Sequence, residues 1–229
     1  SKRVESVAST LMAEDESRVK ITTWNIDKKK DNVRTAVANP DHCIHDANVV
    51  IISEASTGFR SSELPLLSSF VSSKIGSTQI LVRKPSTLEE CEIDRPVLPE
   101  PISPAMTNTE FTAAISCQNG SRLGIIAAYI PPFVTRLETS YNLIRGLATS
   151  SIKLLYEDKC SAVVIGGDFN FDPSENSAHA SSSRRKAWNL AWDAFPQVEI
   201  SLISTTEHTF VPANGKASSC LDAIYLVQT

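Results

Sequence analysis

The sequence predicts one α/β domain built as a sandwich of sheets and helices. Short apolar runs rich in β-branched residues recur along the chain, a pattern typical of buried strands. They lie at 19–24, 49–52, 78–82, 111–115, 123–129, 162–165 and 220–227. Two longer stretches, 139–156 and 181–195, carry apolar residues at helical spacing instead. Many strands with a few interspersed helices, joined by both hairpins and crossovers, favour an α/β sandwich in a single domain.

The size and composition of the chain are those of an ordinary globular protein. It has 229 residues, of which 41% are hydrophobic and 21% charged, and this is enough for one large domain with a substantial core. Because the net charge is −4, any surface for nucleic acid must be a local patch. No apolar run approaches the ~18 residues of a membrane span, and the N-terminus is too polar for a signal peptide.

The cysteines also indicate a protein that is not secreted. There are five, an odd number, and none forms a CxxC pair, so we expect reduced, mostly buried thiols. The protein is therefore expected to be intracellular, nuclear or otherwise, and to have no membrane partner. His42, Cys43 and His45 lie close together in sequence, but without a fourth ligand we expect a surface loop there rather than a metal site.

Three segments lie outside the main pattern of strands and helices. Residues 1–17 place Val4, Val7 and Leu11 at helical spacing, which predicts a helical extension in front of a domain at 18–229. The proline-rich stretch 84–104 is expected to be a loop or an irregular edge. Asn119-Gly120 predicts a tight hairpin, and a closing pair of strands is expected at 209–211 and 220–227.

Polar residues recur where the apolar strands end. After the run 162–165, two glycines allow a sharp turn and are followed by Asp168 and Asn170. Residues i and i+2 of an extended chain point the same way, so both polar heads are expected at one end of a sheet. Other strands carry Asn25, Glu54 and Tyr129 at their ends and Asp222 within the last one. Each alone would be an ordinary cap or turn residue, but their recurrence predicts a shared site at the sheet edge.

Five blocks of the sequence resemble, in order, the motifs of the endonuclease/exonuclease/phosphatase superfamily. They span nearly the whole chain after Ser17 and are Ile21–Asp27, Val50–Glu54, Ala127–Pro131, Gly167–Asn170 and Ser218–Asp222. The resemblance implies a four-layer αββα sandwich, in which two mixed sheets are flanked by helices. It also implies hydrolysis of phosphodiester or phosphomonoester bonds with Mg²⁺ or Mn²⁺ as cofactor.

The resemblance assigns a role to each matching position. Glu54 matches the family's metal-binding glutamate, and Asp168 matches the carboxylate that orients or deprotonates the attacking water. Asn25 and Asn170 match the carboxamides that hold the phosphate and that carboxylate in place. Asp27 falls where some members add a further carboxylate near the metal.

Tyr129 indicates the branch of the superfamily. Members that resemble abasic-site and non-LTR retrotransposon endonucleases carry a tyrosine in this block, where other branches usually place a histidine. Ser53, the run 80–84 and the block 215–222 resemble the retrotransposon group. The implied function is a Mg²⁺-dependent DNA endonuclease that nicks the target of a non-LTR retrotransposon, as a monomeric domain of a larger polypeptide. The alternatives are an abasic-site repair endonuclease, another phosphodiesterase of the superfamily, or an inactive relative that binds nucleic acid or protein.

One block of the family pattern is missing from this sequence. Members end with a Ser-Asp-His block, whose histidine contacts the scissile phosphate and is oriented by the residue that matches Asp222. The sequence reaches Thr229 without such a block. Either a C-terminal strand of the native protein is omitted or the protein is a degraded, inactive relative, and the intact remainder of the site favours omission.

Two basic clusters are candidates for contacts with nucleic acid. They comprise Lys28, Lys29, Lys30 and Arg34 in the first and Arg184 and Arg185 in the second. The first directly follows the Asn25 block, so it is expected to grip the DNA backbone beside the site. The second opens the helix after the Asp168 loop, where a solvated charge run is an equally good interpretation.

Overall fold

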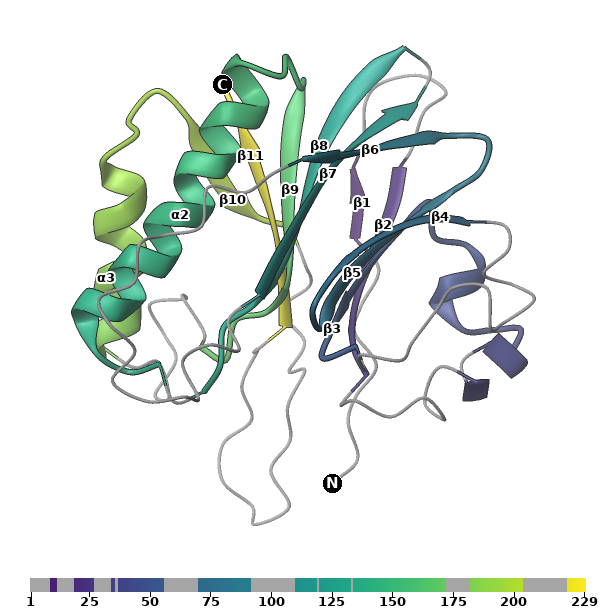
Figure 1. Cartoon of the computed structure of the whole chain (residues 1–229), viewed down its shortest axis with the longest axis horizontal. Coiled ribbons are helices and arrows are strands. Elements are labelled where there is room, and N and C mark those ends of the chain that lie inside the picture. Colours follow the sequence, from purple (N-terminus) through teal and green to yellow (C-terminus); the bar gives the residue numbers. More distant parts are fainter. Residues whose placement is uncertain are drawn as a thin grey trace.

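The computed structural model of the chain describes two sheets that face each other, with helical segments on the outer side of each (Figure 1). The described residues are 9–11, 19–26, 34–35, 37–55, 70–91, 110–118, 120–132, 134–171, 182–203 and 222–229. Strands and helices alternate in the later half of the chain, as the sequence pattern predicts.

The first sheet has five strands in the order β1-β2-β3-β5-β4. Their bounds are β1 (Ser9–Leu11), β2 (Val19–Asn25), β3 (Val49–Ser53), β4 (Phe70–Ile75) and β5 (Thr78–Arg83). β2 and β3 are parallel, and the other neighbours are antiparallel. The carboxyl ends of β2 and β3 therefore lie side by side, with Asn25 in register with Ser53.

The second sheet has six strands in the order β10-β11-β9-β8-β7-β6. Their bounds are β6 (Thr87–Cys91), β7 (Glu110–Gln118), β8 (Ser121–Tyr129), β9 (Ala162–Asp168), β10 (Glu199–Leu202) and β11 (Asp222–Gln228). Only β8 and β9 run parallel. Each sheet thus contains one parallel pair, and both pairs end at the lower end of the molecule in Figure 1.

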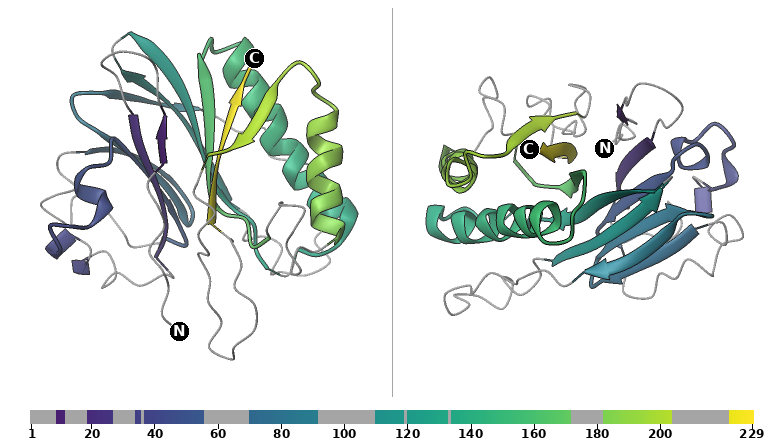
Figure 2. Two further views of the ribbon diagram at one scale, coloured as in Figure 1. Left: turned by 180° about the vertical axis from the view of Figure 1, so that it is seen from behind. Right: turned by 90° about the horizontal axis from the view of Figure 1, so that it is seen from above.

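Helical layers cover the two outer faces. Helices α2 (Leu137–Tyr156) and α3 (Ser182–Asp193) pack on the six-stranded sheet. The 3₁₀ turn η1 (Cys43–His45) lies over the outer face of the five-stranded sheet (Figure 2). The fold class predicted from the sequence, a four-layer α/β sandwich with two mixed sheets, is confirmed.

Burial on both sides explains why the central strands are apolar throughout. β3 is buried along its whole length. Ile51 packs between the sheets with Val164, whereas Val50 and Ile52 face outward and pack against Ile44 of η1. A strand covered on both faces has no solvated side, so it loses the alternation of polar and apolar residues. The sheets approach closely at Gly166, where an added Cβ would lie 2.6 Å from the Cδ1 atom of Ile51.

An aromatic cluster anchors the turn that follows β9. Phe169 is fully buried, and its ring stands edge-on to those of Phe171, Trp188 and Tyr225 at centroid distances of 6.2, 5.8 and 5.4 Å. Edge-to-face pairs of this kind contribute about 0.5–1.5 kcal/mol each beyond burial of their area. The residue between Asp168 and Asn170 is therefore fixed by packing against α3 and β11.

Three expectations from the sequence need correction. A helix is expected at 1–17, but residues 9–11 form the strand β1, which pairs antiparallel with β2. The rest of that segment lies outside the described residues. Within the stretch 84–104, residues 87–91 form a regular strand at the edge of the six-stranded sheet. β11 pairs antiparallel with β9 on one side and, on the other, with β10, a strand the sequence did not reveal. The segment 209–211, the expected partner, lies outside the described residues.

Two simpler features complete the fold. None of the described helices combines the length and apolar character that crossing a bilayer requires. The described cysteines, Cys43, Cys91, Cys117 and Cys160, are free thiols. Burial raises the pKa of the Cys160 thiol to about 11.

Candidate active site

The predicted polar residues meet at one end of the sandwich. In the six-stranded sheet, Asp168 lies opposite Tyr129 of β8 on one side and Asp222 of β11 on the other. In the five-stranded sheet, Asn25 ends β2, and Glu54 directly follows β3. The two parallel pairs end at the same place, so residues far apart in sequence are brought together.

A buried hydrogen bond joins the two sheets at this point. The Asn25 side chain donates from Nδ2 to Oδ2 of Asp168 over 2.5 Å, between residues 143 positions apart in the chain. Both side chains are buried, at 4% and 3% exposure. A buried bond to a carboxylate is stronger than one in water, so this contact fixes the two sheets relative to each other where the polar residues gather.

Asn170 holds the other oxygen of the same carboxylate. Its main-chain N–H donates to Asp168 Oδ1 over 2.9 Å. Its own side chain donates from Nδ2 to the carbonyl of Ile130 over 3.0 Å, and the Ile130 N–H donates to the Asp168 carbonyl over 2.9 Å. The Asp168 carboxylate is thus held from both sides, while each oxygen keeps a further lone pair for another ligand.

Unusual backbone conformations stand on both sides of the site. Glu54 and Asn170 follow the strands of the two sheets and have φ of +52° and +51°, in the left-handed region that few residues other than glycine adopt. Such conformations persist where surrounding contacts hold them, and they gather at functional sites. At Glu54 one such contact is the bond from Ala55 N to the Ser77 carbonyl, 2.7 Å long.

Gly167 is required by a close approach of two strands. Its φ is +143°, and an added Cβ would lie 1.9 Å from the carbonyl oxygen of Ala128 on β8. Any other residue would collide with that main chain, which cannot move aside as the end of a side chain can. The glycine before Asp168 therefore has a structural reason within the site itself.

Burial, together with neighbouring negative charge, raises the pKa of Asp168 to about 8. The largest cause is burial, which disfavours the charged form, followed by the negative charge of Asp222. The charge of Glu54 acts in the same direction, whereas the hydrogen bonds from Asn170 and Asn25 favour the carboxylate. Asp222 and Glu54 are therefore both close enough to act on the Asp168 carboxyl group.

Comparison with known proteins points to one fold. No family model matches this chain, and no curated protein does. Among solved structures, the endonuclease domain of TRAS1, a telomere-specific non-LTR retrotransposon, is similar at TM-score 0.56 and 14% identity, over 90% of this chain and 83% of that one. The structure of SmcL is similar at TM-score 0.60 and 15% identity, over 92% of this chain and 83% of SmcL. The structure of D. rerio TDP2 with a single-strand DNA product is similar at TM-score 0.50 and 13% identity, over 93% of this chain and 99% of that one.

All of these structures belong to the endonuclease/exonuclease/phosphatase superfamily. This chain has the endonuclease/exonuclease/phosphatase fold. Within that fold, the site described above lies where the two parallel strand pairs end, and it combines Asn25, Tyr129, Asp168, Asn170 and Asp222 with Glu54 at its margin. The catalytic roles assigned to these residues from the sequence stay predictions.

The acidic side chains at the site of this endonuclease/exonuclease/phosphatase-fold protein, Asp168, Asp222 and Glu54, are of a kind that binds hard divalent cations. Asp222 and Glu54 both place negative charge near the buried Asp168, and a cation that takes oxygen ligands would offset that charge. Among the described residues, no three His, Cys, Asp or Glu side chains are placed to hold a metal ion by themselves. Asp27, predicted as a metal residue beside Glu54, lies outside the described residues.

His42 and Cys43, for which the sequence predicts a surface loop rather than a metal site, make local contacts. The Nδ1 atom of His42 accepts a bond from Ile44 N at 3.3 Å, and its ring packs against Trp24 at a centroid distance of 5.1 Å. The sulfur of Cys43 lies 3.4 Å from the hydroxyl of Thr22. These contacts fasten η1 to the outer face of the five-stranded sheet.

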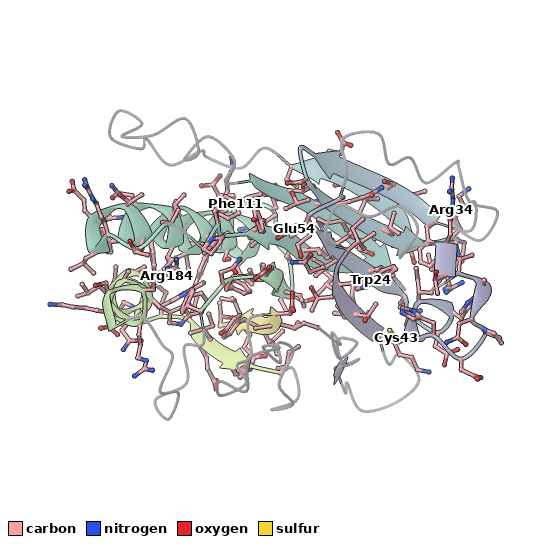
Figure 3. The ribbon with its side chains drawn as sticks, turned by 90° about the horizontal axis from the view of Figure 1, so that it is seen from below. Trp24, Arg34, Cys43, Glu54, Phe111 and Arg184 are labelled. Atoms are coloured by element: carbon pink, nitrogen blue, oxygen red, sulfur yellow. The ribbon has the colours of Figure 1, made fainter. Side chains whose placement is uncertain are left out.

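The basic residues predicted to contact nucleic acid differ in how exposed they are. Lys28, Lys29 and Lys30 lie outside the described residues, and Arg34 is exposed beside the outer layer of the five-stranded sheet (Figure 3). Arg185 is half-buried. Arg184 is only 3% exposed, and its guanidinium donates to main-chain carbonyls; its contact with nucleic acid stays a prediction. Burial lowers the pKa of Arg184, and the charge of Asp168 opposes that shift.

Proposed function

We propose that this protein is a divalent-metal-dependent endonuclease that hydrolyses phosphodiester bonds in DNA. The observation that carries the proposal is the buried bond between Asn25 and Asp168, which joins the sheets beside Asp222 and Tyr129. It presents one oriented carboxyl group at the end of the sandwich, with further acids around it. The fold shared with nucleases and phosphodiesterases supports this reading of the site.

Asp168 is proposed to orient the attacking water and to take its proton. A group whose pKa lies near the working pH accepts a proton and releases it again most effectively, and burial with the neighbouring acids moves Asp168 into that range. Its two oxygens are directed by Asn25 and Asn170, so the carboxylate cannot rotate away. Tyr129, next to it across the parallel pair, offers a phenol that can donate to a phosphate oxygen.

Glu54 is the proposed ligand of Mg²⁺ or Mn²⁺, together with Asp27 or Asn25. Glu54 follows β3 directly and lies between the two sheets when the molecule is viewed from this end (Figure 3). When bound there, a hard divalent cation neutralises negative charge that develops on the phosphate. The role of Glu54 itself is to hold that charge at the end of the sandwich, opposite the Asp168 carboxylate.

The proposed substrate is DNA, and the proposed context is target nicking by a non-LTR retrotransposon. The similarity to the TRAS1 endonuclease domain and the tyrosine-containing block support this context. Lys28, Lys29, Lys30 and Arg34 follow the Asn25 block in sequence and are the proposed contacts to backbone phosphates. Such contacts position a duplex without reading its sequence.

A nicking assay tests the proposed function directly. The protein produced from the complete open reading frame is expected to convert supercoiled plasmid to the open-circular form in Mg²⁺ or Mn²⁺. Added chelator should stop the reaction, and restored cation should restart it, because the cation supplies charge neutralisation that the chain's own residues do not. Nicking that continues unchanged in excess chelator would contradict a metal-dependent mechanism.

Glu54→Gln is expected to weaken binding of Mn²⁺ or Mg²⁺ by at least ~10-fold. Loss of a residue that only hydrogen-bonds to a metal ligand typically lowers metal affinity by about 10–100-fold, and loss of a ligand should lower it at least as much. The fold should remain, because Glu54 is half-exposed and the change removes a negative charge that disfavours ionisation of Asp168. Isothermal titration with Mn²⁺ measures the affinity, and Glu199→Gln on the exposed edge strand β10 is the matched control. Equal affinities of the two variants would remove Glu54 from the metal site.

A further inference from the structure

Arg184 is buried although it lies in the first turn of helix α3. Its side chain is 3% exposed, and Figure 3 shows it on the side of the molecule that carries the helices. The guanidinium donates from Nε to the Val134 carbonyl over 2.5 Å, from Nη1 to the Asn170 carbonyl over 2.5 Å, and from Nη2 to the Pro132 carbonyl. One rigid, planar group thus serves three main-chain acceptors.

The three acceptors belong to the two loops that support the site. Pro132 and Val134 lie in the connection between β8 and α2, and Asn170 lies in the turn after β9. These loops are already linked by the bond from the Asn170 side chain to the Ile130 carbonyl. Arg184 adds a second link from the helix side, so α3, both loops and the end of β9 form one hydrogen-bonded unit.

Asn170 is the residue in this unit whose conformation needs support. Its φ of +51° is sparsely populated for residues other than glycine. In this conformation its N–H donates to Asp168 Oδ1, while its carbonyl accepts from Arg184. The bonds on either side of the Asn170 Cα atom therefore fix the direction of the N–H that orients the carboxylate.

We propose that Arg184 is a positioning residue for Asp168, acting through Asn170 rather than by contact with DNA. The catalytic part of this inference rests on the proposed function, while the structural part stands without it. The inference requires the fork of the guanidinium and not only its positive charge. A lysine ammonium is a single point of donation, and it cannot span the carbonyls of Pro132, Val134 and Asn170 together.

The chain supplies a closely matched control in Arg83. This arginine ends β5, and its guanidinium donates from Nε to the Ala47 carbonyl over 2.9 Å and from Nη2 to the His45 carbonyl over 2.8 Å. It therefore fastens a loop to the main chain in the same way as Arg184. It does so at the end of β5 remote from Glu54 and Asp168, since its N–H bonds to Asn48 just before β3 begins. Arg83→Met thus removes the same chemistry from a place that does not touch the site.

The first measurement is amide hydrogen exchange by NMR in the protein without metal or DNA. Arg184→Met is expected to speed exchange at the Asn170 and Ile130 amides by at least ~10-fold relative to Arg83→Met. The reason is that loss of the arginine's hydrogen bonds lowers the free energy of the local opening that exposes these amides to solvent. Amides in the middle of β3 should exchange alike in the two variants. If Asn170 exchanges equally in both, Arg184 does not hold it and the proposal is overturned.

The second measurement separates kcat from KM in plasmid nicking. Arg184→Met is expected to lower kcat by about 10²-fold with KM for DNA unchanged, since small misplacements of a catalytic group have effects of this size. Arg184→Lys should keep kcat low despite its retained charge, and Arg83→Met should retain the wild-type kcat. A loss that appears in KM instead would make Arg184 a DNA contact and overturn the positioning role.

Two further results are also decisive. If the wild-type protein does not nick DNA, the proposed function fails, and the exchange measurement alone decides whether Arg184 positions Asn170. If Arg184→Met does not fold, Arg184→Lys carries both measurements, because it keeps a buried cation near the same carbonyls. Wild-type exchange at Asn170 together with wild-type kcat in Arg184→Lys would then refute the proposal.

Discussion

Replacing Asp168 with alanine is expected to lower the rate of DNA nicking by about 10²–10⁴-fold, the range that general acid–base catalysis typically contributes. DNA affinity should be kept or should rise, because the change removes a buried negative charge next to the place of an anionic phosphate. Asp168 accepts hydrogen bonds from both Asn25 and Asn170 and precedes Phe169, which packing anchors, so its carboxyl group is held in one orientation. The interaction that is lost therefore acts mainly in the transition state.

Single-turnover nicking at saturating DNA measures the rate, and fluorescence anisotropy in Ca²⁺ measures the affinity. Asp193→Ala on the exposed end of α3 is the matched control, since it removes a carboxylate that takes no part in the site. A parallel fall in rate and affinity would show that Asp168 serves binding, and full activity of Asp168→Ala would end its assignment as the catalytic carboxylate.

The central strands, and the polar residues at their ends, could be located from the sequence because their signals are local. β3, β8 and β9 are buried on both faces, so each appears in the sequence as a continuous apolar run, and a polar residue marks where it ends. The hairpin between β7 and β8 is marked by Asn119-Gly120, and Gly120 has the positive φ, +79°, that such a turn needs.

The edge strands could not be predicted in this way. β1, β6 and β10 each lie at an edge of a sheet, and the described residues of β6 and β10 are mostly exposed or half-buried. Such strands are defined by the neighbour they pair with, which is a property of the tertiary structure and not of their own residues. Leu11 shows the ambiguity, since it suits a helical repeat with Val4 and Val7 but lies opposite Val19 in the sheet.

Contacts between the two sheets did not follow from local sequence patterns, although the resemblance to the superfamily implied that Asn25 helps to hold the Asp168 carboxylate. The strand-end pattern placed Asn25 and Asp168 at sheet edges, but nothing local indicated that the edges of different sheets would face each other across a hydrogen bond. The burial of Arg184 did not follow from the sequence for a related reason. An arginine beside another basic residue at the start of a helix indicates a solvated surface, and only the folded loops show the three carbonyls that it serves.

A gain in stability is the second large effect expected at Asp168. In the metal-free protein, Asp168→Asn should raise the free energy of unfolding at pH 8 by on the order of 2–5 kcal/mol, since each pKa unit between the folded and unfolded states corresponds to about 1.4 kcal/mol. Burial and the charge of Asp222 raise the folded-state pKa from 3.8 to about 8. The folded state therefore binds the proton more tightly than the unfolded state, and stability is lost as the pH rises from about 4 to 8. The asparagine carries no charge to bury, and Asn25 can turn its amide so that its oxygen accepts from the new side chain.

Urea unfolding of both proteins between pH 4 and pH 8 in chelator measures this difference. The two stabilities should be close near pH 4 and separate steadily as the pH rises, whereas the exposed-site control Asp193→Asn should run parallel to the wild type. Asp222→Asn should recover part of the gain, because it removes the second-largest cause of the shift in Asp168. Saturating Mn²⁺ should narrow the gap between Asp168→Asn and the wild type, since a bound cation favours the carboxylate that the asparagine lacks. A gap that is constant with pH would mean that Asp168 is already charged in the folded protein at pH 4, and that the neighbouring acids do not hold its proton.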